Sequence, residues 1–298
     1  MTPSISIKEA VDQLLELIDL EEIDENIYRG QNEKGRPGRL FGGQVAAQAL
    51  AATGRTVSNQ VAHSLHGYFL RPGDPAVPVV YTVDRIRDGR SFTTRRVVAQ
   101  QRGRAIFNMS VSFHTPEEGY THQFDMPDVP PPEALMSRKE HYEKLADKLP
   151  EEVIQWARRT NPIETRTARP PAFLSSEPND EPGIVWLRAG SVLPDDPFLH
   201  QCVLTYATDL SLIDCILQPH GRMGPLGPLM LASLDHAIWF HKPLRADDWL
   251  LYHQDSPSAF GARGLARGNL YTIKGELVAS VVQEALIRPV GKHHDRSE

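Results

Sequence analysis

Cysteine and long apolar runs are both scarce in this sequence, and each scarcity argues against a class of protein. Cys202 and Cys215 are the only cysteines among 298 residues, which argues against a disulfide framework or a zinc site and fits a reducing compartment. No apolar run is long enough for a membrane span. The acidic N-terminal stretch is unlike a signal or transit peptide, and the C-terminal residues are no recognisable peroxisomal address. We therefore expect a cytoplasmic protein.

Concentrated positive charge and the common hydrolase motifs are also missing. The 32 basic and 38 acidic residues give a net charge of -6, and the lack of a basic tract argues against nucleic acid or anionic lipid as a partner. Neither the GxSxG motif of a serine hydrolase nor the HExxH spacing of a metal site occurs. We expect no metal and no organic cofactor.

The stretch from Val203 to Leu217 has apolar residues on all sides of a helix, which is typical of a buried helix. Its only charges are Asp209 and Asp214. A lone carboxylate in such surroundings costs several kcal/mol unless it is paired, hydrogen-bonded or near water. Both aspartates are therefore candidates for function, and the alternative is a structural role satisfied by hydrogen bonds.

The chain before residue 115 predicts a helix followed by an antiparallel sheet. An opening helix is expected from Ile5 to Ile18, and the Gly42-Gly43 pair leads into a run of small helix formers. From residue 61 the apolar period changes to two, with turns at 88–89 and 102–103. We expect about four strands here and assign residues 1–114 to a first repeat.

Prolines then interrupt the pattern. Residues 115–185 are expected to form a proline-rich connector, with one surface helix from Arg138 to Arg159. Residues 186–298 return to a helix and antiparallel strands. At an offset of 171 residues, Val79-Val80-Tyr81 aligns with Leu250-Leu251-Tyr252 and Arg96 with Arg267. The chain therefore looks like an α+β fold that has been duplicated internally.

Positions that differ between the two halves indicate where a function lies. Ser233 aligns with Ala62 at the offset of 171, and Gln283 aligns with Val111 after one residue inserted at the later turn. The second half therefore has an amide and a hydroxyl where the first is apolar. With Asp209 these residues could form a hydrolytic site without a covalent intermediate. Asp209 would act as general base, while Ser233 and Gln283 would hold the water. A buried amide paired with backbone is the alternative for Gln283.

Several stretches together resemble the acyl-CoA thioesterase II family of double hotdog proteins. They are RGQ (29–31), LFGGQVAAQAL (40–50), HSLHGYFLRPGD (63–74), RDGRSFTTRRV (87–97), WLRA (186–189), LTYATDL (204–210), LASLDHAIWFHKP (231–243) and ARGNLYT with GELVASVVQEALIR (266–288). The resemblance implies two repeats, each a long helix wrapped by an antiparallel sheet. It also implies hydrolysis of fatty acyl-CoA to free acid and CoA.

The resemblance carries the family's catalytic aspartate, threonine or serine, and glutamine to Asp209, Ser233 and Gln283. Serine in place of threonine keeps the hydroxyl and removes a methyl. The family's histidine in the first half matches His63, which is a candidate for substrate binding.

Two other functions stay open at this stage. A hotdog hydratase or dehydratase would need a histidine, His63 or His66, beside Asp209, and a non-catalytic acyl-CoA-binding protein would use the polar trio only for its own hydrogen bonds. For the strand histidines 63, 66, 236 and 241 a core or interface position is the expected role. Five arginines at positions 90, 95, 96, 263 and 267 could meet CoA phosphates and are not assigned. Exposed sheet edges predict a homodimer or homotetramer.

Overall fold

The structure is a computed structural model that describes residues 5–34, 38–149, 151, 154, 158–174, 177–221 and 229–290. Within these residues the α-helices with assigned bounds are α1 (Ile7–Ile18), α2 (Gly42–Gly54), α3 (Arg138–Lys144), α5 (Pro197–Thr208) and α6 (Leu212–Leu217). The strands are β1 (Glu21–Asp24), β2 (Ile27–Gly30), β3 (Val61–Phe69), β4 (Val79–Asp88), β5 (Phe92–Gln101), β6 (Arg104–His114), β7 (Met136–Ser137), β8 (Ile163–Thr167), β9 (Gly183–Ala189), β10 (Leu229–Ser233), β11 (Asp235–Phe240), β12 (Leu250–Phe260), β13 (Arg263–Thr272) and β14 (Leu277–Pro289).

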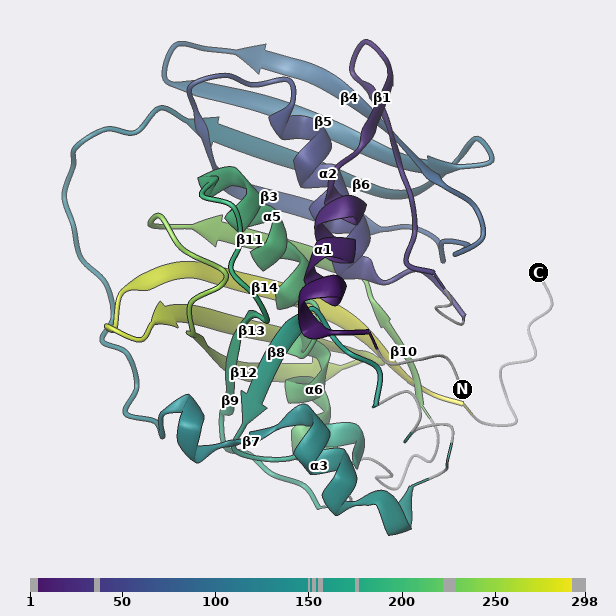
Figure 1. The fold of residues 1–298 in the computed structure, drawn as a ribbon, viewed down its shortest axis with the longest axis vertical. Helices are drawn as coiled ribbons and strands as arrows, with labels where there is room; N and C mark the ends of the chain where they lie inside the picture. Colours follow the sequence, from purple (N-terminus) through teal and green to yellow (C-terminus); the bar gives the residue numbers. More distant parts are fainter. Residues whose placement is uncertain are drawn as a thin grey trace.

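One antiparallel sheet passes through both halves of the chain (Figure 1). Its order is β1-β2-β4-β5-β6-β3-β11-β14-β13-β12-β9-β8-β7, and β10 also pairs with β14. The segment β4-β5-β6-β3 is followed by its mirror image, β11-β14-β13-β12, and the antiparallel pair β3 and β11 joins the two. This arrangement confirms the predicted α+β fold of two repeats, each with a central helix and an antiparallel sheet.

Strand register in the two halves follows the alignment of the repeats, with an offset of 171 residues at Ser233 and 172 at Ala285, after the inserted residue. Ala62 pairs with Phe113 in the first half, and Ser233 pairs with Ala285 in the second. The pairing of β3 is irregular immediately after Ala62. In the second half, the break between β10 and β11 comes immediately after Ser233. Equivalent residues therefore occupy equivalent places in the sheet.

The same cross-strand ion pair also occurs twice. Arg96 Nε and Nη2 donate to Asp84 Oδ2 at 2.9 and 2.6 Å. Arg267 Nε and Nη2 donate to the two carboxylate oxygens of Asp255 at 2.9 Å each. Because Asp84 and Asp255 are also 171 residues apart, the pairs are repeats of one feature.

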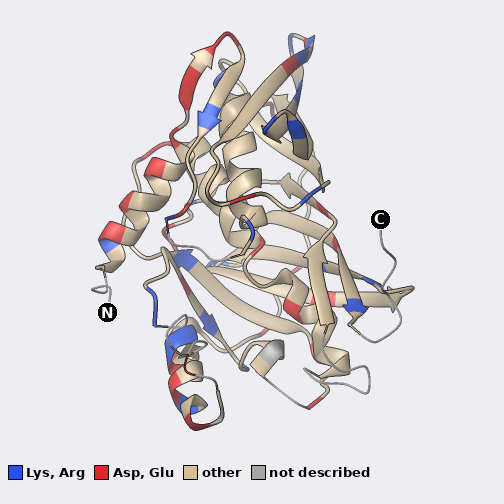
Figure 2. Ribbon diagram, turned by 90° about the vertical axis from the view of Figure 1, so that its right-hand side faces the viewer, with Lys and Arg blue, Asp and Glu red and all other residues tan. Residues whose placement is uncertain are grey.

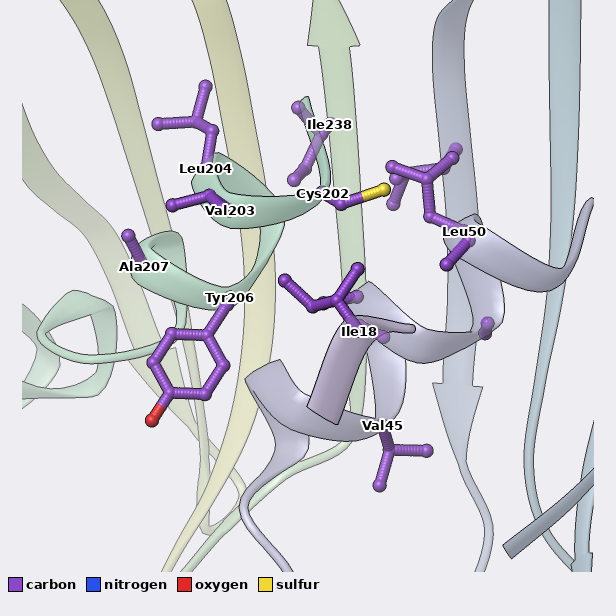
Figure 3. Packing of buried hydrophobic residues seen from close by; sticks show 14 of the residues in the cluster. Ile18, Val45, Leu50, Cys202, Val203, Leu204, Tyr206, Ala207 and Ile238 are labelled. Atoms are coloured by element: carbon purple, nitrogen blue, oxygen red, sulfur yellow. The ribbon is translucent and has the colours of Figure 1, made fainter. Parts of the chain in front are cut away.

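Helices α2 and α5 form the centre of the core. Residues Gly43–Thr53 are all buried, as are Cys202–Thr208, because small and apolar side chains cover each helix on all sides. Figure 3 shows Leu50 of α2 on the side of Cys202 of α5, and Ile18 of α1 between α5 and Val45 of α2. Charged residues lie mainly on the outer strands, loops and outer helices (Figure 2).

The two central helices run antiparallel and approach closely. A Cβ atom at Gly43, near the start of α2, would lie 2.5 Å from the carbonyl oxygen of Tyr206, near the end of α5. At the other end, a Cβ at Gly54 would lie 2.1 Å from Phe198. The Gly42-Gly43 pair is thus required for close approach, and it brings the N-terminus of α2 to the C-terminal end of α5.

Two predicted helices are shorter than expected. The buried helix predicted from Val203 to Leu217 is divided into α5 and α6, because Asp209 has φ -85° and ψ 0° and Ser211 has φ -136° and ψ -11°. Asp and Ser favour such breaks because their side chains compete with the backbone for hydrogen bonds.

The predicted surface helix from Arg138 to Arg159 is also wrong in length, since α3 ends at Lys144. A short 3-10 turn follows, and Leu149 is extended, with φ -114° and ψ 145°. Proline disfavours the helical conformation in the residue before it, and residue 150 is a proline.

The domain limits stay a proposal. The limit after residue 114 coincides with the end of β6, whereas the limit after residue 185 divides β9. The connector therefore contributes β7, β8 and part of β9 to the sheet of the second half. Among the described helices, none is long and apolar enough to cross a membrane.

Gly43→Ala tests the close approach of α2 and α5. Alanine would gain about 1 kcal/mol of helix propensity, but its methyl group cannot avoid the Tyr206 carbonyl, so we expect a net loss of about 1–2 kcal/mol in the free energy of unfolding. Gly119→Ala is the control, because a Cβ there meets nothing within 4 Å. Denaturant unfolding measures both; a Gly43→Ala protein as stable as wild type would contradict the packing.

Candidate functional site

Asp209 lies at the break between α5 and α6, where the end of one central helix meets the start of the other. It is the C-cap residue of α5, and its side chain is turned toward the first residues of α2. Its Oδ2 atom accepts a hydrogen bond of 2.8 Å from the backbone N–H of Gly43. The carboxylate therefore lies between the two halves of the chain, at the positive end of the α2 dipole.

Ser233 and Gln283 bind the other carboxylate oxygen. The Ser233 hydroxyl donates to Asp209 Oδ1 at 3.3 Å, and Gln283 Nε2 donates to the same atom at 3.2 Å. Gln283 Nε2 also donates to Ser233 Oγ at 2.7 Å. The three residues predicted from the sequence to form a site are thus in mutual contact, although they come from three separate elements of the fold.

The three side chains differ in their access to solvent. Gln283 is fully buried on β14, whereas Asp209 and Ser233 are only partly buried. Asp209 and Ser233 are therefore at the more exposed end of the trio, while the amide is fixed within the sheet.

Burial raises the pKa of Asp209 above its ordinary value of 3.8, because a charged carboxylate loses hydration there. A protonated His236 would act in the opposite direction, as do the hydrogen bonds from Gln283, Gly43 and Ser233. A carboxylate with a raised pKa is a stronger proton acceptor than a solvated one, which suits a general base.

His236 and Thr208 lie behind Gln283. His236 Nδ1 is 2.7 Å from Gln283 Oε1, and His236 Nε2 is 2.9 Å from Thr208 Oγ1. The histidine is 1% exposed, and burial lowers its pKa, while the charge of Asp209 acts in the opposite direction. The expectation of a core position is confirmed for this histidine.

Sequence reasoning missed the contacts that His236, Thr208 and the N–H of Gly43 make in this site. A signal existed for His236, since the period of two in β11 places it on the same buried face as Ile238 and Phe240. The glycine pair predicts a helix start. The partner of the Gly43 N–H group is not predictable, because it depends on contact between elements 166 residues apart.

His63 lies elsewhere. Its Nε2 atom is 2.8 Å from Ser112 Oγ, and its ring packs against Phe92 and His114. Phe69, the last residue of β3, borders Gly42 near Asp209. His63 lies six residues before Phe69 in the same strand, which corresponds to about 20 Å along a strand. His63 is the first-half counterpart of the residue after Ser233, and its binding of substrate stays a prediction.

His66 and His241 contact other residues than Asp209 in the part of the chain that the structure describes. His66 is exposed, with its ring edge-on to Trp239 at 4.8 Å between centroids. His241 is also exposed, immediately after β11, and contacts Ser280. Neither of these two is a core histidine.

Four of the five arginines considered for CoA phosphates already have carboxylate partners. Arg96 and Arg267 form the repeated pairs described above, and Arg263 pairs with Glu284 at 2.9 Å. Arg95 is not on the surface: it is 1% exposed and binds Asp88, both the hydroxyl and carbonyl oxygens of Thr56, and further backbone carbonyls.

A cavity of about 350 Å³ lies against the break between α5 and α6. Its wall includes Tyr206, Leu210, Ser211 and Asp214 from these helices, together with residues of β9, β12 and the connector. Burial raises the pKa of Asp214 from 3.8 to about 7, while the charge of Arg138 acts in the opposite direction. The cavity is adjacent to Asp209 through Leu210.

Similarity to known proteins extends over most of the chain. A family model described as acyl-CoA thioesterase matches residues 158–286, and one described as acyl-CoA thioesterase N-terminal domain matches residues 33–114. Acyl-coenzyme A thioesterase 8 of Mus musculus is 40% identical over 282 residues, covering 91% of this chain and 88% of the mouse protein. Acyl-CoA thioesterase 2 of Haemophilus influenzae is 35% identical and covers 95% and 99%.

A solved structure agrees with these relatives. The acyl-CoA thioesterase II TesB2 from Mycobacterium marinum superposes with a TM-score of 0.75 at 43% sequence identity, covering 93% of this chain and 99% of that protein. The described architecture is therefore shared with the proteins named in this comparison.

Asp214→Asn tests the burial of the second aspartate. Because the pKa of Asp214 rises from 3.8 unfolded to about 7 folded, the folded state holds this proton more tightly. Its contribution to stability is present below pH 4 and is lost as the pH rises to about 7. The variant should thus be more stable than wild type at neutral pH by on the order of 2 kcal/mol, and no more stable at pH near 4.

Urea unfolding across this pH range measures the difference, with Asp180→Asn as the matched change at an exposed aspartate. An equal stability difference at both ends of the range would contradict the raised pKa.

Proposed function

The chain belongs to the acyl-CoA thioesterase family and hydrolyses acyl-CoA thioesters, and we propose that Asp209, Ser233 and Gln283 activate the attacking water. The observation that carries this assignment is the convergence of Ser233 and Gln283 on one oxygen of Asp209, while the N–H of Gly43 holds the other. These three donors are thereby fixed around the carboxylate of one partly buried residue.

Asp209 acts as the general base. Its carboxylate takes a proton from water as the water oxygen forms a bond to the thioester carbonyl carbon. The tetrahedral intermediate then collapses, the carbon–sulfur bond breaks, and the proton on Asp209 passes to the CoA sulfur. The products are a free fatty acid and CoA, and the carboxylate returns to its starting state.

Ser233 and Gln283 orient the water and the base. The serine hydroxyl can both donate and accept, so it can hold a water molecule beside Asp209, and the Gln283 amide supplies a donor from the buried side. Fixed orientation lowers the entropic cost of attack.

The N-terminus of α2 stabilises the oxyanion. An α-helix leaves its first four N–H groups without intrahelical partners. Gly43 uses its N–H for Asp209, and other N–H groups of the first turn of α2 are the proposed donors to the negative charge that develops on the carbonyl oxygen. The missing side chains at Gly42 and Gly43 keep this approach open.

The cavity at the helix break is the proposed place for part of the substrate. Leu210 and Ser211 line it and follow Asp209 directly. A thioester whose carbonyl lies at Asp209 can therefore extend one of its ends into the cavity without displacing α2 or α5.

A hydratase is disfavoured by geometry. It would need His63 or His66 beside Asp209, but His63 lies about 20 Å along β3 from the site, and His66 is exposed. A cytoplasmic location and a homodimer or homotetramer remain parts of the proposal. The bacterial relative supports the location, and the exposed edges of the sheet support the assembly.

Asp209→Asn tests the base. Removal of a general base lowers the rate by about 100-fold to 10,000-fold, because asparagine cannot accept the proton of water. Thiol release from acyl-CoA esters of different chain lengths measures kcat for the variant and wild type. Asp84→Asn is the control, since it makes the same change at a surface ion pair.

Full activity in a folded Asp209→Asn protein would show that another group accepts the proton. Loss of activity in the Asp84→Asn control as well would show that the effect of Asp209 is not specific.

The pH profile tests the environment of Asp209. Since its pKa is raised above 3.8 and only the carboxylate can accept a proton, kcat should fall as the pH drops through a midpoint above 3.8. Ser233→Ala removes a hydrogen bond that lowers this pKa, so the midpoint should move to higher pH in the variant. A midpoint that stays in place or moves to lower pH would contradict the role of Ser233 at Asp209.

A further inference from the structure

A hydrogen-bonded series of polar side chains runs from Asp209 into the sheet. It passes from Asp209 to Gln283, then to His236 and Thr208, with separations of 3.2, 2.7 and 2.9 Å. Gln283, His236 and Thr208 are each no more than 1% exposed, so the last two cannot touch substrate. The hydrogen bond to Gln283 is the contact through which His236 can act on the group that holds Asp209.

The proton positions in this series of side chains follow from the carboxylate of Asp209 at one end of it. A carboxylate oxygen only accepts hydrogen bonds, so the NH2 group of Gln283 faces Asp209 and Oε1 faces His236. An amide oxygen also only accepts, so His236 Nδ1 carries the proton. Burial lowers the pKa of His236, and in the neutral ring Nε2 can only accept. The Thr208 hydroxyl then has two acceptors within reach, Nε2 at 2.9 Å and the Thr205 carbonyl oxygen at 3.0 Å.

The first half of the chain has an apolar counterpart of this pair. Leu65 pairs directly with Val111 between β3 and β6, and the offset that aligns the halves places His236 at Leu65 and Gln283 at Val111. Leu65 and Val111 are both fully buried. The sheet therefore folds around an apolar pair at this place, and the polar pair is not needed for its packing.

We propose that His236 is a positioning residue, which holds the amide of Gln283 with its NH2 group toward Asp209 and Ser233. The proposal rests on the function assigned above to Gln283. It explains why an imidazole is buried here when leucine suffices in the other half.

The need for such a residue arises during the reaction. While Asp209 is ionised, its charge alone favours the observed orientation of the amide. Once Asp209 has taken the proton from water, it becomes a possible donor, and a rotated amide with Oε1 toward Asp209 would be equally well paired. The Nδ1–H of His236 opposes that rotation, because a rotated NH2 group would face an N–H donor.

The first experiment compares His236→Leu with His236→Asn. Leucine reproduces the first-half residue and removes the donor, whereas the side-chain amide of asparagine places an N–H close to the position of Nδ1. Loss of a group that orients a functional residue costs about 10-fold to 100-fold in activity. We expect that loss in kcat for His236→Leu with KM changed little, and a smaller loss for His236→Asn.

A double-mutant cycle tests whether His236 acts through Gln283. Gln283→Val reproduces the other first-half residue, and the cycle compares each single variant with the double variant. If His236 acts only by orienting the amide, adding His236→Leu to Gln283→Val should lower kcat by less than about 3-fold, since no amide is left to orient. Thermal unfolding of each variant establishes that it is folded.

Three results would overturn the proposal: wild-type kcat in folded His236→Leu, equal loss in folded His236→Asn and His236→Leu, or losses that multiply in the double variant. If His236→Leu does not fold, the comparison of His236→Asn with wild type decides, and a loss of the full magnitude counts against it. Wild-type activity in Gln283→Val would instead refute the function assigned to Gln283, which is a separate outcome.

Discussion

The hydrogen bond from the N–H of Gly43 to Asp209 is the interaction on which the site depends. It joins the start of α2 to the end of α5 across the two halves of the chain, at 2.8 Å. It forms only because the helices run antiparallel and because Gly42 and Gly43 have no side chains to separate them. Once α5 ends at this point, the carboxylate of Asp209 is available to both Ser233 and Gln283.

Duplication of the fold explains how a polar site is tolerated inside an apolar core. The first half keeps Ala62, Leu65 and Val111 where the second half has Ser233, His236 and Gln283, with the same strand register in both. One repeat can thus supply packing and the N-terminus of α2, while the other carries the hydrogen-bonding side chains. Neither half contains the complete set of groups around Asp209.

Much of this fold and part of the site were predictable from the sequence. Period, turns and the 171-residue offset predicted the two repeats, and comparison of aligned positions selected Ser233 and Gln283. The break at Asp209 was not predictable, because nothing in an apolar stretch indicates that the side chain of one residue accepts a hydrogen bond from another helix. Likewise, the contact between His236 and Gln283 depends on strand pairing between β11 and β14, and the burial of Arg95 depends on its partners Thr56 and Asp88.

We propose that Asp209 activates water and is not itself acylated, since both of its oxygens are held by hydrogen-bond donors. The most direct test is a single turnover of acyl-CoA, with enzyme in excess, in water labelled with oxygen-18. Direct attack by water predicts that the fatty acid formed carries one labelled oxygen and that the peptide containing Asp209 carries none. An unlabelled fatty acid with label in the Asp209 peptide would mean that the carboxylate attacks the thioester, and would contradict the account.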